Sequence, residues 1–192
     1  MFEYLMPVLW MRTYPNTLLD NARTAAVRLQ QIYAGEKGVP WGISESAFAK
    51  RDEAGNYQYQ AFGLPKISLR NGEPDALVIS PYSTFLALNV DSGEAMRNLR
   101  RMGADGWMGP YGFYESADYS STGRHSWRRR HELVRCWMAH HQGMSLLAMA
   151  NFLHDGVVQR WFHDERRVQA TELLLHEKPA GNVRREFDGA AA

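Results

Sequence analysis

Val39–Phe48 reads V-P-W-G-I-S-E-S-A-F and holds one carboxylate, Glu45, between the aromatic residues Trp41 and Phe48. Proline and glycine interrupt this stretch, so it predicts a loop rather than a long helix. Aromatic neighbours exclude water from a carboxyl group, which suits the floor of a binding pocket. A surface glutamate beside a turn explains this one stretch equally well.

Two further segments favour the pocket. Trp107–Tyr119 reads W-M-G-P-Y-G-F-Y-E-S-A-D-Y and places Glu115 and Asp118 among five aromatic residues. His140–Met144, H-H-Q-G-M, is a polar cluster in an otherwise apolar run. Sugars stack their C–H faces on aromatic rings, so loop aromatics that packing does not require indicate a carbohydrate-binding cleft.

Charge and hydropathy argue against several kinds of partner. The chain has 192 residues, with 22 basic and 21 acidic residues and a net charge of +1, which gives no general attraction to nucleic acid or to membrane surfaces. The short basic run Arg128–Arg130 is followed by Glu132, as on a solvated helix face. No apolar run is long enough to span a membrane, and the N-terminal residues lack the features of a signal peptide.

Metal and cofactor sites are not expected. Cys136 is the only cysteine, so the chain has no internal disulfide and no cysteine-based zinc site. His140 and His141 are the sharper alternative, but adjacent histidines seldom face one metal, and no H-E-x-x-H motif is present.

Helical periodicity and capping residues predict an all-α fold of six or seven helices packed as antiparallel hairpins. Long loops are expected over 39–75 and 107–126, with a short extended piece over 57–62. The run 128–138 fits either a helix or an extended segment. Helices are expected over 8–14, 18–34, 81–88, 94–102, 142–154, 159–163 and 168–177. Leu146–Leu153 is apolar nearly all round, which predicts that other helices surround it.

Five motifs in fixed order carry a resemblance to a known family. They read M-F-E-Y-L-M-P, P-W-G-I-S-E-S-A-F, Y-Q-Y-Q-A-F-G-L-P, Y-G-F-Y-E-S-A-D-Y and M-A-H-H-Q-G-M-S-L. Together they resemble the glucoamylase-like region of bacterial cyclic β-1,2-glucan synthases, and the endo-β-1,2-glucanases are related to it. The likeness runs from Met1 to about Glu177.

The resemblance implies an (α/α)6 toroid with a cleft built by its connecting loops, and a transglycosylase that closes or rearranges β-1,2-glucan. A full toroid needs about twelve helices, so the chain resembles only the C-terminal half. Residues 1–178 are expected to form this partial domain, and 179–192 a flexible tail. The parent enzyme is expected in the bacterial inner membrane, while this chain is expected to be soluble and cytoplasmic. A half toroid would also expose apolar edges, which predicts a homo-oligomer or pairing with the missing half.

Glycoside cleavage needs two carboxyl groups across the scissile bond. Glu45 and Glu115 are the predicted pair, with Glu45 preferred as acid/base and Glu115 as nucleophile, and Asp118 is a reserve carboxylate whose alternative is a loop hydrogen-bonder. Transfer by a retaining mechanism predicts a separation of roughly 5 to 5.5 Å. The candidate substrate-binding residues are Glu3, Trp41, Arg51, Tyr57, Gln58, Tyr111, Tyr114, Asp118, His140, His141 and Gln142.

The predicted ligand is β-1,2-glucan or another glucose oligosaccharide, bound without a cofactor. Tyr59 and Phe113 are further rings that could stack on sugar, although core packing explains many of these aromatics. Two functions of different kinds remain open. One is an enzyme that cleaves or transfers β-1,2-glucosidic linkages. The other is a catalytically inactive fragment that binds glucan or associates with a partner.

Overall fold

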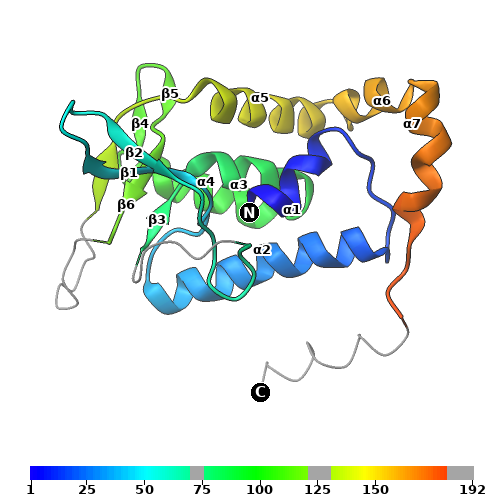
Figure 1. Cartoon of the computed structure of the whole chain (residues 1–192), viewed down its shortest axis with the longest axis horizontal. Coiled ribbons are helices and arrows are strands. Elements are labelled where there is room, and N and C mark those ends of the chain that lie inside the picture. Colours follow the sequence, from blue (N-terminus) through cyan, green and yellow to red (C-terminus); the bar gives the residue numbers. More distant parts are fainter. Residues whose placement is uncertain (70–75, 121–130, 181–192) are drawn as a thin grey trace.

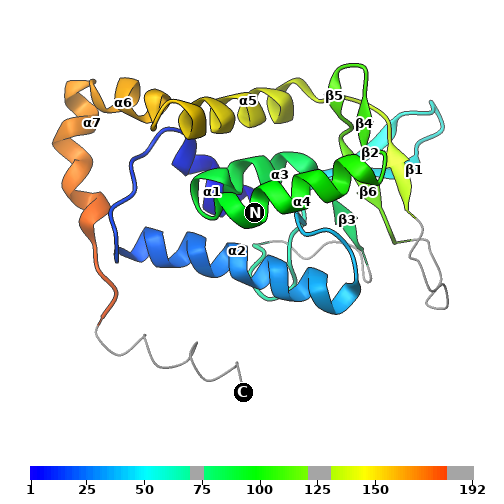
Figure 2. The ribbon, with the colours of Figure 1, turned by 180° about the vertical axis from the view of Figure 1, so that it is seen from behind.

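The computed structural model of the chain describes residues 1–69, 76–120 and 131–180. Helices form most of the molecule and the short strands gather at one end of it (Figure 1). In the same view α5 and α6 lie along one edge, α2 lies along the opposite edge, and α1, α3 and α4 lie between them. The view from behind shows the same separation of strands from the α6 and α7 end (Figure 2).

The first helices lie earlier than the sequence suggests. α1 spans Phe2–Leu5 and continues into the 3₁₀ helix η1, Met6–Leu9, where Pro7 occupies the first turn. The expected helix over 8–14 is therefore wrong. Leu5 and Leu9 are fully buried, so core contacts fix this segment rather than the initiating preference of proline.

α2 spans Leu18–Lys37 and follows the capping rules closely. The side chain of Thr17 accepts a hydrogen bond from the backbone N–H of Asp20, as an N-cap residue does. Gly38 ends the helix with φ of 69°, a left-handed conformation that glycine adopts without steric cost. The predicted helix over 18–34 is confirmed. It continues past Gly35 and ends three residues later than predicted, at Lys37.

Two strands flank the Glu45 stretch. β1, Ser46–Arg51, pairs antiparallel with β2, Tyr57–Gln60. Ser46 pairs with Gln60 and Ala47 with Tyr59, and a register irregularity then precedes the pairing of Arg51 with Tyr57. The extended piece expected over 57–62 is confirmed, whereas β1 forms where the sequence predicts a loop.

The middle of the chain forms the core helices. α3, Pro81–Leu86, continues into the 3₁₀ helix η2, Ala87–Asn89, and α4 spans Ser92–Ala104. Asp91 caps α4 by accepting the N–H of Glu94, as its place before the helix predicts. α3 packs against both α4 and α5, so its residues are buried on nearly every side.

Three small antiparallel sheets correct the all-α expectation in part, although helices still dominate the described residues. One is the β1–β2 hairpin, the second pairs β4, Met108–Gly109, with β5, Gly112–Phe113, and the third has the order β3–β6–β7. Its strands are β3, Val78–Ile79, β6, Ser116–Asp118, and β7, Glu132–Val134. Strands of two or three residues carry no readable alternation of polar and apolar positions, so the sequence does not reveal them.

The C-terminal helices run away from the strands. α5 spans Ala139–Leu153, α6 spans Val157–His163, and α7, Arg166–Thr171, continues into the 3₁₀ helix η3, Glu172–His176. Leu146 is 63% exposed and Leu153 is 70% exposed, so α5 is not surrounded by helices of this chain as expected. The basic run 128–130 and the tail from 181 lie outside the described residues.

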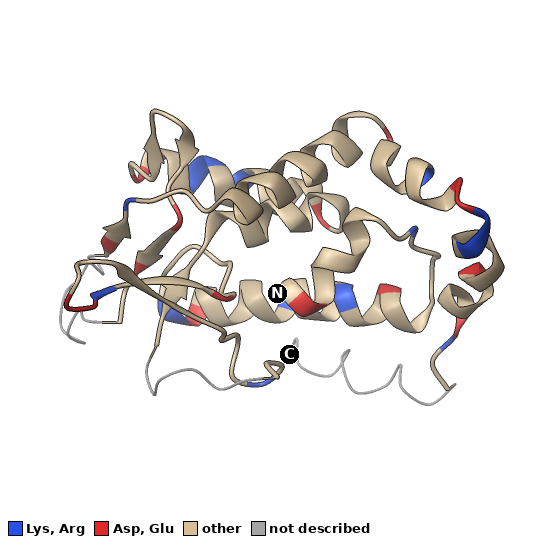
Figure 3. Ribbon diagram, turned by 45° about the horizontal axis from the view of Figure 1, so that its top comes forward, with Lys and Arg blue, Asp and Glu red and all other residues tan. Residues whose placement is uncertain are grey.

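The described residues include no helix that is both long and apolar enough to cross a membrane. Lysine and arginine are interspersed with aspartate and glutamate along the described ribbon (Figure 3).

Candidate active site

The two carboxylates predicted from sequence come together at the strand end of the molecule. Glu45 lies just before β1 and is partly exposed, whereas Glu115 lies just before β6 with a side chain that is 1% exposed. The backbone N–H of Ala47 donates to Oε1 of Glu115 over 3.3 Å, which fixes that carboxylate beside β1. The Glu45 and Glu115 segments are thus held against each other.

Two side chains join the carboxylates. The hydroxyl of Tyr59, on β2, donates to Oε1 of Glu45 over 2.8 Å and lies 3.4 Å from Nε2 of His141. Nδ1 of His141, on α5, lies 2.9 Å from both carboxylate oxygens of Glu115. We call the four residues Glu45, Tyr59, His141 and Glu115 the carboxylate bridge.

Tyr82 on α3 contacts both His141 and the backbone of Glu45. Its ring stacks on the His141 ring with centroids 3.7 Å apart and an interplanar angle of 11°. Its hydroxyl lies 2.8 Å from the hydroxyl oxygen of Ser44 and donates to the backbone carbonyl of Glu45 over 3.1 Å. Buried polar side chains with this many partners have little freedom, so Tyr82, His141 and Glu115 are held in place.

Burial and charge shift the titration of the groups around the bridge. Burial, together with the hydrogen bond to Glu45, raises the pKa of Tyr59 well above its usual range. Burial likewise raises the pKa of Tyr82. Burial, and then the neighbouring His141, lowers the pKa of His140 below its usual value. Both phenols therefore remain protonated at any physiological pH.

Asp118 is bound by the backbone rather than open to solvent. It is 5% exposed, and its carboxylate accepts the N–H of Ala49 over 3.0 Å and the N–H of Ser120 over 2.8 Å. These contacts tie β6 to β1. They are those of the loop hydrogen-bonder that the sequence offered as the alternative to a reserve carboxylate.

Three predicted substrate-binding residues lie on the β1–β2 hairpin. The guanidinium of Arg51 lies 4.1 Å from the ring centroid of Tyr57 and donates to its hydroxyl over 2.6 Å. The Tyr57 hydroxyl also accepts the N–H of Arg135 over 3.4 Å. Gln58 lies half-buried between Tyr57 and Tyr59. The hairpin therefore presents polar and aromatic groups beside the bridge.

A second aromatic group surrounds Trp137, which sequence reasoning did not select. Tyr111 is 77% exposed and meets the Trp137 ring edge-on at 5.1 Å, and Tyr114 lies 5.1 Å from the same ring. Gln142 on α5 donates to the carbonyl of Phe113 over 3.2 Å, which ties this group to the helix that carries His141.

The remaining predicted residues lie in different surroundings. Trp41 is 6% exposed and belongs to the core, where its backbone pairs with Asn98. Glu3 on α1 is 41% exposed and lies 3.9 Å from the Met1 amino group. His140 is exposed, with its ring 6.0 Å from the Tyr59 ring. His140 therefore borders the bridge from the solvent side.

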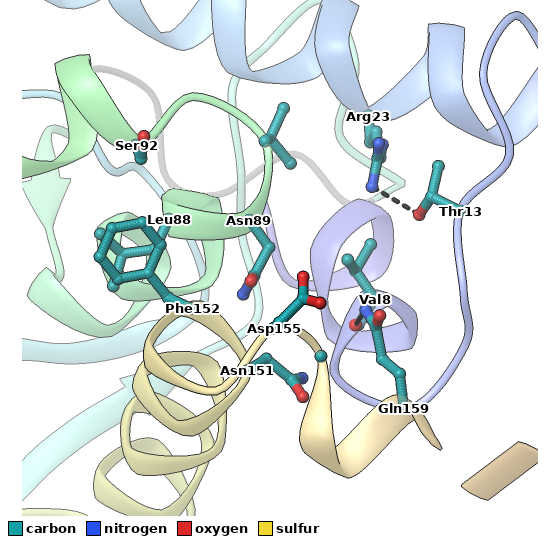
Figure 4. Close-up of a pocket in the computed structure, with 12 residues that line it drawn as sticks. Val8, Thr13, Arg23, Leu88, Asn89, Ser92, Asn151, Phe152, Asp155 and Gln159 are labelled. Atoms are coloured by element: carbon teal, nitrogen blue, oxygen red, sulfur yellow. Dashed lines mark hydrogen bonds between the residues drawn. The ribbon is translucent and has the colours of Figure 1, made fainter.

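A cavity among the described residues lies elsewhere. It has a volume of about 450 Å³ and is lined by residues of η1, α2, η2, α5 and the loop before α6, including Arg23, Asn89 and Asp155 (Figure 4). Arg23 donates to Thr13 at its edge. None of the residues that line this cavity belongs to the carboxylate bridge. Within 1–69, 76–120 and 131–180, no group of three or more His, Cys, Asp or Glu side chains is placed to hold a metal ion.

The relatives of this chain place it among β-1,2-glucan-related carbohydrate-active domains. The chain belongs to the family described as "Putative glucoamylase", which matches residues 1–166. It is 40% identical over 183 residues to the cyclic beta-(1,2)-glucan synthase NdvB of Rhizobium meliloti (strain 1021). That match covers 95% of this chain and 6% of the synthase, so the chain spans a small part of its relative.

Solved structures share the fold at low sequence identity. The endo-beta-1,2-glucanase from Chitinophaga pinensis, in a sophorotriose and glucose complex, is 18% identical with a TM-score of 0.62, over 92% of this chain and 40% of that one. The beta-1,2-glucanase from Parabacteroides distasonis is 17% identical with a TM-score of 0.66, over 91% of this chain and 24% of that one. Both matches use almost all of this chain and less than half of the other.

Sequence reasoning named Glu45, Glu115 and His141 as site candidates, and all three lie in the bridge. It gave Tyr59 only as a stacking ring and did not select Tyr82. A signal for Tyr59 as a strand residue is present, because tyrosines alternate with glutamines over 57–60. Its partner could not be read from the sequence, because that depends on the hairpin register.

Proposed function

We propose that this chain supplies the carboxylate site of a domain that cleaves or transfers β-1,2-glucosidic linkages. The observation that carries the proposal is the carboxylate bridge, which brings two acidic residues from distant loops into one hydrogen-bonded group. Family membership and the 40% identity to a cyclic β-1,2-glucan synthase support the substrate class. The similarity to β-1,2-glucanase folds supports an (α/α)6 toroid of which this chain forms part.

The surroundings of the two carboxylates suit different roles. Glu115 faces Nδ1 of His141 and the backbone N–H of Ala47, which hold its carboxylate in one orientation, as a nucleophile requires. Glu45 reaches solvent and touches the protonated phenol of Tyr59, which suits a group that exchanges protons with a sugar oxygen. We therefore assign Glu45 as the acid/base and Glu115 as the nucleophile.

Sugar would reach this site over the aromatic hairpin. In the proposal, Arg51, Tyr57 and Gln58 line one side of the approach, and Tyr111, Tyr114 and Gln142 line the other. His140 borders the entrance. Glu115 is only 1% exposed, so a sugar reaches its carboxylate only after the side chains that cover it rearrange.

The direct test follows linear β-1,2-glucan in the presence of the full 192-residue chain. Chain length by chromatography and product anomer by NMR separate hydrolysis from transfer and retention from inversion. Glu45→Gln and Glu115→Gln are each expected to lower the rate by at least about 100-fold, the range attributed to a positioned acid or base. Glu53→Gln, in the exposed hairpin loop, is the matched control and is expected to leave the rate unchanged.

A second candidate is a glucan-binding module without activity of its own. The near-complete burial of Glu115 favours it, as does the fact that the chain covers at most 40% of the two solved glucanases. Its signature is saturable glucan binding by calorimetry without any change in glucan length. Equal, low rates for wild type, Glu45→Gln and Glu115→Gln would rule out the enzymatic proposal for this chain.

A further inference from the structure

The Tyr59 hydroxyl has one proton and two possible hydrogen-bond partners. Its oxygen lies 2.8 Å from Oε1 of Glu45 and 3.4 Å from Nε2 of His141. On the other side of the imidazole, Nδ1 faces both oxygens of Glu115 at 2.9 Å. With Glu115 as the ionised nucleophile of the proposed function, its carboxylate only accepts hydrogen bonds, so Nδ1 carries a proton. The proton on Nε2 is thereby linked to the direction in which Tyr59 donates.

Two arrangements satisfy all of these contacts with the same number of protons. In the first, Glu45 is ionised, Tyr59 donates to it, and Nε2 of a positively charged His141 donates to the Tyr59 oxygen. In the second, Glu45 is a carboxylic acid that donates to the Tyr59 oxygen, and Tyr59 donates to Nε2 of a neutral His141. Total charge is equal in the two arrangements, so they differ only by the position of protons along the bridge.

We propose that Tyr59 and His141 form a proton relay that protonates Glu45 from the buried imidazole of His141. The inference rests on the proposed function, because it is useful only if Glu45 acts as the acid. Both relay residues act through Glu45 rather than on the sugar, so they are positioning residues. No component outside the chain is needed, since each proton is already held by the bridge.

The transfer is balanced at every atom. The O–H bond of Tyr59 breaks as an O–H bond forms on Glu45, and the N–H bond at Nε2 of His141 breaks as the O–H bond of Tyr59 forms again. Glu45 then gives its proton to the leaving sugar oxygen. The proton of the incoming acceptor hydroxyl returns to Glu45, and the reverse shift along Tyr59 restores the charged imidazole.

Packing keeps the relay in line. The Tyr82 ring lies flat against His141 with centroids 3.7 Å apart, which prevents the imidazole from turning away from Tyr59 and Glu115. The contact of 3.4 Å between Tyr59 and His141 is long for a hydrogen bond, as contacts in unliganded active sites often are. The raised pKa of Tyr59 keeps its phenol protonated, so the proton that the relay moves is present at rest.

Other ionisable groups face the bridge and belong in the interpretation of any pH profile. Tyr82 and His140 lie within electrostatic reach of both carboxylates, and the pKa of Cys136 responds to Glu115. The buried amino group of Met1 is influenced by Glu45. None of these groups makes a described hydrogen bond to Tyr59 or to a ring nitrogen of His141.

Tyr59→Phe tests the relay because it removes the hydroxyl and keeps the ring. We expect turnover of linear β-1,2-glucan to fall about 10-fold to 100-fold, with a changed pH profile, because acid assistance is lost. Turnover of a sophorose glycoside with a dinitrophenolate leaving group should stay within about 2-fold, because that group leaves without a proton. Tyr33→Phe, on α2 away from the bridge, is the matched control and should change neither rate.

The second test is spectroscopic and does not depend on enzymatic activity. In long-range ¹H–¹⁵N spectra of the full chain, Nε2 of wild-type His141 should report a nitrogen that carries a proton or accepts one. In Tyr59→Phe it should report a bare acceptor nitrogen, while Tyr33→Phe should match wild type. Replacing Tyr59 with fluorotyrosine keeps the hydroxyl and should restore both the nitrogen signal and the glucan rate.

The outcomes separate the two proposals. If no variant or wild-type chain acts on glucan, the proposed function fails, and the spectra still decide whether Tyr59 bonds to His141. If Tyr59→Phe slows both substrates equally, or leaves the His141 nitrogen signals unchanged, the relay is overturned and Tyr59 is a packing residue. If Tyr59→Phe does not fold, the fluorotyrosine chain decides: a pH profile identical to that of wild type overturns the relay.

Discussion

His140 is the residue whose titration reports most directly on the charge of Glu45. Burial and the adjacent His141 lower the pKa of His140, and the negative charges of Glu115 and Glu45 oppose that shift. Glu45→Gln removes one of those negative charges, so the pKa of His140 should fall further below the usual value of about 6.5. NMR titration of the His140 ring protons measures it.

The sign of that shift is what matters. Glu53→Gln removes a charge of the same kind from the exposed hairpin loop and should leave the His140 titration as it is in wild type. An unchanged His140 midpoint in Glu45→Gln would show that Glu45 carries no negative charge beside this imidazole.

Glu115 and His141 stabilise the fold through a fully buried contact. Each side chain is 1% exposed, so removing one partner leaves the other desolvated and unpaired. Glu115→Ala is expected to lower the free energy of unfolding by about 3 kcal/mol, whereas Glu115→Gln, which keeps an acceptor for Nδ1, should cost less. Urea denaturation followed by circular dichroism measures both variants.

Glu53, an exposed glutamate, is the control for the Glu115 stability measurement. Glu53→Ala should change the free energy of unfolding by less than about 0.5 kcal/mol, as surface substitutions usually do. A similar small effect for Glu115→Ala would mean that water replaces the carboxylate beside His141, and that the pair is not closed to solvent.

At the level of elements, α2 offers two glycines with opposite expectations. Gly38 has φ of 69°, which strains any residue with a Cβ, whereas Gly35 lies inside the helix, where an added Cβ would meet no other atom within 4 Å. Gly38→Ala should destabilise the chain by about 1 kcal/mol, and Gly35→Ala should stabilise it by about 0.5 to 1 kcal/mol. Thermal unfolding of the two variants side by side gives the signs.

Equal effects of the two substitutions would contradict the capping account of α2. The comparison is well matched, because both positions are exposed and both changes add one methyl group. The difference between them therefore reports backbone conformation alone.

Elements with local signals could be predicted, and those without could not. Thr17, Gly38 and Asp91 mark helix ends by capping chemistry, which is local in sequence, and α2 and α4 follow from it. β6 is three residues long and gains its hydrogen bonds from β3 and β7, which are distant in the chain. Pairing of that kind leaves almost no trace in a single sequence.

In the candidate site, too, the residues with a local sequence signal could be predicted, and their contacts could not. Motifs identified Glu45, Glu115 and His141 because each stands out among aromatic or apolar neighbours. That His141 is buried and turned toward Glu115 was not predictable, since it depends on how α5 packs against α3. Trp41 shows the converse error of pattern reading, because an aromatic residue beside glycine can equally be core.

At the scale of the whole molecule, apolar side chains face solvent along the C-terminal helices. Leu146 and Leu153 on α5 are 63% and 70% exposed, and Leu173 and Leu174 on η3 are 82% and 75% exposed. Exposed apolar groups of this extent mark surfaces that associate. The chain alone is expected to self-associate, with a mass by light scattering that rises with concentration.

Charge on this surface should oppose the association. The double variant Leu146→Glu, Leu153→Glu should shift the distribution toward monomer without changing the circular dichroism spectrum, since neither side chain belongs to the core. Leu69→Glu is the control, because Leu69 is 79% exposed and belongs to the loop after β2 rather than to α5 or η3. A wild-type chain that stays monomeric at every concentration would contradict the prediction.

The irregular pairing of the β1–β2 hairpin separates its tip from its base. Ala47 opposite Tyr59 fixes the distance between the phenol and Glu45, and the register irregularity follows before Arg51 reaches Tyr57. A change in the length of the turn over 52–56 acts first on the pairing of Arg51 with Tyr57, because that pair lies next to the turn. The pairing of Ala47 with Tyr59 lies beyond the irregularity, so the tip of the hairpin can change shape without moving the phenol away from Glu45.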